Sequence, residues 1–222
     1  MIVCSECGRD NPDDARFCNS CAAPLAPAAA PREQRKVVTV LFCDVTGSTS
    51  LGEQLDPEAM RTVMARYFET ARTAIERHGG TVEKFIGDAV MAVFGVPVVH
   101  EDDALRAVRA AAELRDAVEI DVRIGVNTGE VVTGGADTLA TGDAVNVAAR
   151  LEQAASPGEV FLGAATYALV RDVVDAELLP PLEAKGKAEP LTAYRLGRVR
   201  QAPGRRADDR ARRRARAAAP CI

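Results

Sequence analysis

Two pairs of closely spaced cysteines restrict how the start of this chain can fold. Four of its six cysteines lie in the first 21 residues, as Cys4-x2-Cys7 and Cys18-x2-Cys21. Each pair can present two thiolates from one tight turn, and four thiolates complete the tetrahedral shell of a structural Zn²⁺ ion. Two disulfides or a redox-active CxxC are the alternatives. Disulfides are rare in cytosolic chains, and a redox CxxC needs a strand–helix scaffold that this segment lacks. We therefore expect a small module that folds around zinc.

The rest of the chain has the composition of a water-soluble globular protein. Hydrophobic residues make up 47% of the 222 residues, which is ordinary for a folded core. No apolar run approaches the roughly 18 to 20 residues of a membrane helix, and the N-terminus lacks the basic and apolar regions of a signal peptide. We expect a cytoplasmic protein with no membrane partner.

Charge is segregated along the chain. The segment from Arg195 to Ile222 holds ten arginines and two aspartates, a balance of +8, so residues 1–194 carry 18 basic and 30 acidic groups, a balance of −12. An acidic body argues against a globular nucleic-acid binder, although the basic tail could touch polyanions. We interpret residues 198–222 as a basic, disordered tail and consider a nucleic-acid partner unlikely.

The pattern of strands and helices divides the remaining chain. We expect a zinc module at 1–24, a linker rich in proline and alanine at 25–36, and a catalytic domain at 37–197. Periodicity and turn residues predict an α+β fold with a mostly antiparallel sheet flanked by helices. The expected strands span 37–42, 81–86, 89–94, 121–127, 130–133 and 160–162, with helices at 57–78, 101–118, 143–155 and 164–170, a polar turn at 45–50 and a hairpin across 185–187.

Two aspartates stand directly beside apolar strands. Asp44 closes the first strand, and Asp88 sits in the tight turn of the hairpin that should lie next to it. Carboxylates in such places are costly unless they are paired or bind cations, and two of them could hold two divalent ions for phosphoryl transfer. The segment Thr46-Gly47-Ser48-Thr49 offers backbone N–H groups that could hold a triphosphate. Taken singly, each aspartate is better explained as a turn or cap residue, and only the segments described next favour the metal site.

Five segments in order resemble the class III nucleotidyl cyclase family. They are VVTVLFCDVTGSTSL, VEKFIGDAVMAVFG, VRIGVNTGEVVTG, TGDAVNVAARLEQA and LEAKGKAEPLTAYRL, and together they cover residues 37–197. The N-terminal segment is similar to the short zinc ribbons that precede many bacterial regulatory proteins. The resemblance implies the ferredoxin-like, palm-type cyclase fold behind a zinc ribbon.

The resemblance also implies a set of metal and phosphate ligands. Asp44 and Asp88 match the aspartates that bind two Mg²⁺ or Mn²⁺ ions, with the carbonyl of Val45 as a further ligand. Ser48 and Thr49 match the backbone positions that bind the terminal phosphates.

The remaining matched residues concern the nucleoside and the transition state. Lys84 matches the lysine with which adenylate cyclases read adenine, whereas guanylate cyclases usually carry glutamate there. Asn146 and Arg150 match the residues that orient the ribose and stabilise the pentavalent phosphorus, and their i, i+4 spacing places them on one helix face. Lys185 matches the lysine that contacts the triphosphate.

Each of these residues has an ordinary alternative role. Arg150 could be a solvated helix residue or hydrogen-bond to Gln153, Lys84 could form a surface ion pair with Glu83, and Lys185 could be a solvated turn residue. One position departs from the family, because Leu139 stands where a second purine-reading Asp or Thr is usual. A leucine cannot exchange a hydrogen bond with the adenine amino group, although Thr138 or Thr141 could replace it.

The resemblance implies conversion of ATP to 3′,5′-cyclic AMP and pyrophosphate at the interface of a homodimer, in intracellular signalling. The alternatives are a guanylate cyclase, a non-catalytic nucleotide-sensing domain and a nucleic-acid binder. Many relatives continue beyond this domain, so the abrupt arginine-rich segment raises the hypothesis of a truncated or frame-shifted reading frame.

Overall fold

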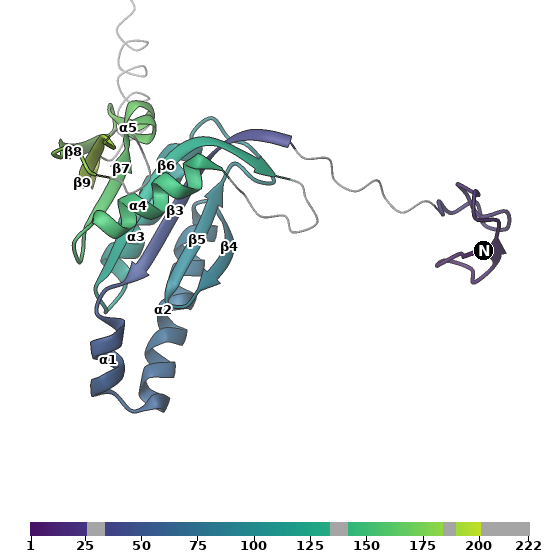
Figure 1. The fold of residues 1–222 in the computed structure, drawn as a ribbon, viewed down its shortest axis with the longest axis horizontal. Coiled ribbons are helices and arrows are strands. Elements are labelled where there is room, and N and C mark those ends of the chain that lie inside the picture. The colour runs from purple at the N-terminus through teal and green to yellow at the C-terminus, as the bar shows by residue number, and fades with distance from the viewer. Residues whose placement is uncertain (26–33, 134–141, 184–189, 201–222) are drawn as a thin grey trace, which may run out of the picture.

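A seven-stranded sheet organises the chain from residue 34 onward in the computed structural model, which describes residues 1–25, 34–133, 142–183 and 190–200. The strands run in the order β4-β5-β3-β6-β7-β9-β8, and only β6 and β7 are parallel neighbours within these ranges (Figure 1). Their bounds are β3 Gln34–Val45, β4 Thr81–Ile86, β5 Ala89–Phe94, β6 Val122–Thr133, β7 Val160–Gly163, β8 Val174–Leu178 and β9 Ala193–Val199. The expected α+β fold with a mostly antiparallel sheet is confirmed.

Strand β3 lies at the centre because both of its faces are apolar. Its side chains alternate between two cores, with Leu41, Cys43 and Val45 in one and Val38, Val40 and Phe42 in the other. It pairs along its whole length with β6, and through Thr39–Cys43 with β5. A strand buried on both faces reads as a continuous apolar run, which is the pattern that predicted it.

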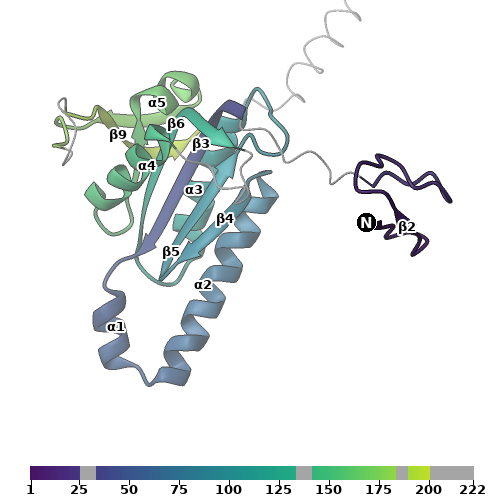
Figure 2. The same cartoon turned by 45° about the vertical axis from the view of Figure 1, so that its right-hand side comes forward.

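Helices cover both faces of this sheet. Helices α2 and α3 lie over one face, and α4 lies over the other, across β3 and β6 (Figures 1 and 2). The helix α2 begins as expected, since the side chain of Asp56 accepts a hydrogen bond of 2.8 Å from the N–H of Ala59. The bounds are α1 Ser48–Gln54, α2 Pro57–Arg77, α3 Asp103–Ala117, α4 Asp143–Ala154 and α5 Ala164–Val170.

Helix α4 approaches β6 unusually closely at Gly125. A Cβ atom on this glycine would lie 2.2 Å from the carbonyl oxygen of Ala148 and 2.4 Å from the backbone nitrogen of Glu152. Both neighbours are backbone atoms, so neither can move without displacing the helix. The missing side chain at Gly125 therefore sets the height of α4 above the sheet, and with it the position of every side chain that α4 carries.

Three local expectations were wrong. The segment expected as a polar turn forms α1 from Ser48, and the two strands expected at 121–127 and 130–133 are one continuous strand, β6. Gly129 does not interrupt β6 because β3 pairs with it on both sides of that residue. Strand β8 was not expected, and it forms through antiparallel pairing with β9.

The first 25 residues form a separate small unit built on two short strands. Strand β1, Ile2–Val3, pairs antiparallel with β2, Asp10–Asn11. The four cysteine Sγ atoms lie within 4.8 Å of one another, with Cys4–Cys21 at 3.6 Å and Cys7–Cys18 at 3.5 Å. Four thiolates around Zn²⁺ at about 2.3 Å would stand roughly 3.8 Å apart, so the cluster fits a tetrahedral zinc site.

Backbone donors prepare one of these thiols for a metal. The N–H groups of Cys21 and Ser20 point at the sulfur of Cys18 and lower the pKa of this thiol to about 6. A thiolate is the form that binds zinc. The hydrogen bonds of Asn11 to the carbonyl of Arg9, at 2.8 Å, and from the N–H of Asn19, at 3.0 Å, fasten the two halves of the unit together.

Within the described ranges, no helix is long and apolar enough to cross a lipid bilayer.

Replacing Gly125 by alanine should destabilise the protein by about 2 kcal/mol or more, because the new methyl group collides with backbone atoms. Chemical denaturation followed by circular dichroism measures this loss. Gly52→Ala is the matched control, since nothing lies within 4 Å of a Cβ atom at Gly52 in α1 and alanine should stabilise the helix by roughly 0.5 kcal/mol. Equal stability of the two variants would contradict the close approach of α4.

The purified protein should carry one zinc ion per chain, and Cys18→Ser should lose it because one of four ligands is removed. Native mass spectrometry and a colorimetric zinc assay give the stoichiometry. Zinc should also be released in acid, because protons compete with the metal for the thiolates. Cys43→Ala should keep the zinc, since Cys43 is buried in the sheet; zinc loss in this control would disprove the assignment.

Candidate functional site

The two carboxylates expected to bind metal lie at the ends of neighbouring strands. Asp44 is the last but one residue of β3, and Asp88 lies in the turn between β4 and β5. Cys43 pairs with Val90, so continuing this register sets Val45 opposite Asp88. Carboxylate and carbonyl oxygens are the hard donors that Mg²⁺ and Mn²⁺ prefer, and the donor set therefore fits a divalent cation.

Asp44 is held by a cation from the next strand. Arg123 of β6 is its direct cross-strand partner, and the Nη2 of Arg123 donates to the Oδ2 of Asp44 at 2.6 Å. Directly paired residues share a face of the sheet, here the face that α4 covers. Only 16% of the Asp44 side chain is exposed, so this charge-assisted hydrogen bond is shielded from solvent.

A second carboxylate, from α4, holds Arg123 on its other side. The Oε1 of Glu152 lies 2.6 Å from the Nε of Arg123, in an ion pair too oblique to be an aligned hydrogen bond. The Glu152 side chain is 7% exposed. Its burial raises the pKa of the Glu152 carboxyl to about 7, against the opposing charge of Arg123. Asp44, Arg123 and Glu152 therefore form one partly buried row of charges that links β3, β6 and α4.

Tyr67 of α2 supports the end of β3 from the opposite face. Its hydroxyl donates to the carbonyl oxygen of Cys43 at 3.3 Å and contacts the Cys43 sulfur at 3.4 Å. Burial raises the pKa of the Cys43 thiol to about 12 and keeps it neutral. Cys43 is thus a small, fully buried residue, and both faces of the sheet fix the backbone that carries Asp44.

The expected phosphate-binding segment follows β3 at once. Gly47 adopts φ 71° and ψ 20°, a left-handed conformation that suits glycine, and α1 begins at the next residue. Ser48 and Thr49 are therefore the first two residues of α1, where backbone N–H groups lack partners within the helix.

The residues expected to act on the nucleoside come from two other elements. Asn146 and Arg150 lie one turn apart on α4, with Asn146 exposed and Arg150 half-buried. Lys84 is exposed on β4, in a row with Met91 and Phe42 across the sheet. It therefore lies two strands from β3, about 10 Å away. Leu139 and Lys185 lie outside the described residues.

Sequence reasoning missed Arg123 and Glu152. A basic residue within the otherwise apolar strand segment VRIGV should have drawn attention, because a charge in a strand covered on both faces requires a partner. The identity of that partner depends on the β3–β6 register and on the height of α4, which no local pattern gives.

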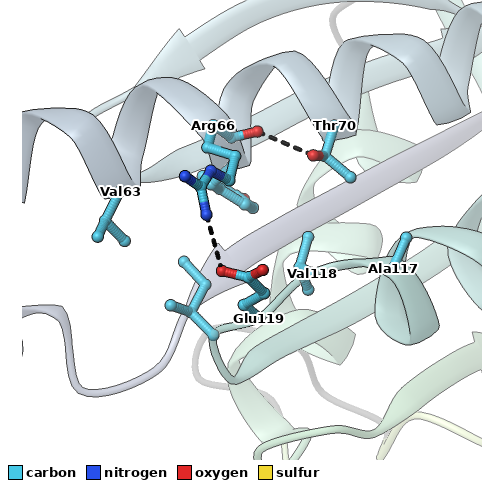
Figure 3. A pocket seen from close by; sticks show the side chains of 8 residues that line it. Val63, Arg66, Thr70, Ala117, Val118 and Glu119 are labelled. Atoms are coloured by element: carbon cyan, nitrogen blue, oxygen red, sulfur yellow. Dashed lines mark hydrogen bonds and ion pairs between the residues drawn. The ribbon is translucent and has the colours of Figure 1, made fainter.

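A separate pocket of about 190 Å³ opens between α2 and the segment that follows α3 (Figure 3). An ion pair of 3.0 Å between Arg66 and Glu119 crosses it, and Thr70 donates to the carbonyl of Arg66. Tyr67 also lines this pocket, so it lies behind the end of β3, but it contains none of the expected site residues.

Comparison with known families identifies both parts of the chain. Residues 30–197 match the model of the adenylate and guanylate cyclase catalytic domain, and residues 3–25 match that of a zinc-ribbon domain.

The curated relatives of this chain include two adenylate cyclases. Adenylate cyclase 1 of Rhizobium meliloti is 30% identical over 73% of this chain, and the adenylate cyclase of Anabaena cylindrica is 33% identical over 52% of it. The chain spans only 28% and 26% of the lengths of these two proteins.

Among solved structures, the adenylyl cyclase CyaB from P. aeruginosa is 32% identical with a TM-score of 0.73, over 78% of this chain and 100% of that one. The guanylyl cyclase Cya2 is 30% identical with a TM-score of 0.71, over 78% of this chain and 96% of that one. The family match covers most of the chain, and the sheet and helices agree with these folds. The chain belongs to the class III adenylate and guanylate cyclase family, with a zinc ribbon before its catalytic domain.

Proposed function

We propose that this chain is an adenylate cyclase that converts ATP to 3′,5′-cyclic AMP and pyrophosphate in intracellular signalling. The observation that carries the proposal is the pair of carboxylates, Asp44 and Asp88, at adjacent strand ends of a cyclase domain. Lys84, on the same sheet, supplies the preference for adenine.

Asp44, Asp88 and the carbonyl of Val45 are the proposed ligands of two Mg²⁺ or Mn²⁺ ions. When bound, such ions lower the pKa of the attacking 3′-hydroxyl and neutralise charge on the phosphates. Both carboxylates are half-buried at neighbouring strand ends, where their oxygens are of the kind that Mg²⁺ and Mn²⁺ prefer.

The remaining groups hold the substrate for in-line attack of the ribose 3′ oxygen on the α-phosphorus. The backbone of Ser48 and Thr49 and the ammonium of Lys185 would bind the terminal phosphates. Asn146 would orient the ribose, while the Arg150 guanidinium would donate to the α-phosphate as charge develops there. The spacing of Asn146 and Arg150 along α4 lets both side chains reach one ligand.

Base selection rests on Lys84, whose ammonium can donate to N1 of adenine. Guanine carries a hydrogen on N1 and would repel this donor. Leu139 supplies no second polar contact, and the chain is similar to both adenylyl and guanylyl cyclases of known structure. GTP is therefore the second candidate substrate.

A homodimer would complete the site. One protomer would supply Asp44, Asp88 and the phosphate segment, and its partner Lys84, Asn146, Arg150 and Lys185. Strand β4 is an edge of the described sheet, and beside Lys84 it exposes Phe85 by 38% and Ile86 by 48%. Exposed apolar side chains on an unpaired edge strand are typical of a contact surface, which supports this arrangement.

Purified protein with Mn²⁺ and ATP should form cyclic AMP, and Asp44→Ala or Arg150→Ala should lower kcat by roughly 100-fold or more, since each removes charge stabilisation of the transition state. Chromatography coupled to mass spectrometry quantifies the product. A wild-type signal no greater than that of the Asp44 variant would contradict catalysis. ATP binding without product would instead select a nucleotide sensor.

Mixing the inactive Asp44→Ala and Arg150→Ala chains should restore part of the activity, because a heterodimer of these variants contains one intact composite site. The assay is repeated at several mixing ratios, with each variant alone as the control. Failure of every mixture to exceed the single variants would contradict the proposed dimer.

Lys84→Glu should shift the ATP-to-GTP preference in kcat/KM towards GTP by roughly 10- to 100-fold, the range expected for one hydrogen bond to a charged group. Both nucleotides are assayed in parallel, with Glu83→Gln as the control on the neighbouring strand position. An unchanged preference would show that Lys84 does not read the base.

A further inference from the structure

The row of charges formed by Asp44, Arg123 and Glu152 indicates a role for a residue outside the proposed set of ligands. We propose that Glu152 is a positioning residue for the metal ligand Asp44, acting through Arg123. The inference rests on the proposed role of Asp44 in binding a divalent cation and deepens it.

The geometry gives the Arg123 guanidinium two fixed contacts. Its Nη2 donates to one oxygen of Asp44 at 2.6 Å, and its Nε faces Glu152 at 2.6 Å. A planar guanidinium anchored at one edge presents its other donors in a defined direction. Glu152 thereby fixes where Arg123 meets Asp44, and Arg123 in turn holds the Oδ2 oxygen of Asp44.

The charge balance points the same way. Two carboxylates share one guanidinium, so the row keeps a net charge of −1 if all three groups are ionised. Without Glu152, Arg123 would neutralise Asp44 completely and oppose an incoming cation. In its ionised form, Glu152 therefore offsets the charge of Arg123, so that Asp44 keeps its attraction for Mg²⁺ or Mn²⁺.

The position of Glu152 is itself set by the fold. The backbone nitrogen of Glu152 is one of the two atoms that a Cβ on Gly125 would strike, so α4 lies directly on β6 at this point. Glu152 is buried, and a buried carboxylate that served only packing would be costly compared with an apolar residue. The ion pair with Arg123 offsets the free-energy cost of burying the Glu152 carboxylate.

Replacing Glu152 by glutamine tests the proposal with little change of shape. Glu152→Gln should weaken Mn²⁺ binding about 10-fold, as loss of an outer-shell partner commonly does. Electron paramagnetic resonance of free Mn²⁺, in the presence of a non-cyclisable ATP analogue, measures this without turnover. Asp44→Ala identifies the signal of the site, and thermal melting reports folding separately.

The matched control is Glu159→Gln, which breaks the 2.9 Å ion pair with Arg195 away from the site. It should leave Mn²⁺ binding unchanged. In the cyclase assay, Glu152→Gln should raise the Mn²⁺ concentration needed for half-maximal rate about 10-fold and leave kcat at saturating Mn²⁺ within about threefold. A purely structural role would lower the active fraction but not move this concentration.

A double-mutant cycle separates action through Arg123 from a simple effect of charge. On an Arg123→Gln background, Glu152→Gln should change Mn²⁺ binding by less than about twofold, because the connecting residue is gone. The same 10-fold loss on both backgrounds would overturn the proposal, as would wild-type Mn²⁺ binding by Glu152→Gln. Mn²⁺ binding without any cyclic product would refute the proposed function and still leave the role of Glu152 measurable.

Discussion

The contact of α4 with β6 at Gly125 is the constraint on which the rest of the catalytic half depends. Because the helix backbone rests on the strand backbone there, the side chains of α4 have fixed heights above the sheet. Glu152 reaches Arg123, and Asn146 and Arg150 are held one turn apart on the same rigid element. A bulkier residue at position 125 would lift all three side chains together, so the glycine at this position sets their common height above the sheet.

The two faces of the sheet contribute differently to the end of β3. On one face, Tyr67 fastens the Cys43 carbonyl from α2, among neutral and mostly apolar neighbours. On the other face, Asp44 meets the charged pair of Arg123 and Glu152. Alternation of side chains along one strand thus places an apolar anchor and a polar site at adjacent residues. The backbone between them has little freedom, which suits the role proposed for Asp44.

Much of the fold could be predicted from the sequence because local signals agree with the final packing. The hairpin of β4 and β5 and the helix α5 have the expected bounds, since tight turns and apolar periodicity act over a few residues. The prediction of a turn where α1 forms was wrong because a polar run after Gly47 is as typical of a turn as of a helix start. The prediction of two strands in place of β6 was wrong because only the pairing with β3 shows that the strand continues through Gly129.

The places of Asp44 and Asp88 at neighbouring strand ends could be predicted from the sequence, whereas the contact of Asp44 with Arg123 could not, because it depends on strand register. Arg123 and Glu152 are 29 residues apart and meet only after β6 and α4 have packed.

The central place of β3 in the sheet also affects folding during synthesis, because one of its two neighbouring strands is made much later. Asp44 precedes its partner Arg123 by 79 residues. At typical translation speeds, β3 leaves the ribosome roughly 4 to 16 s before β6 can cover its second edge. The apolar strand β3 therefore has an uncovered edge during this interval, when it can pair with other chains.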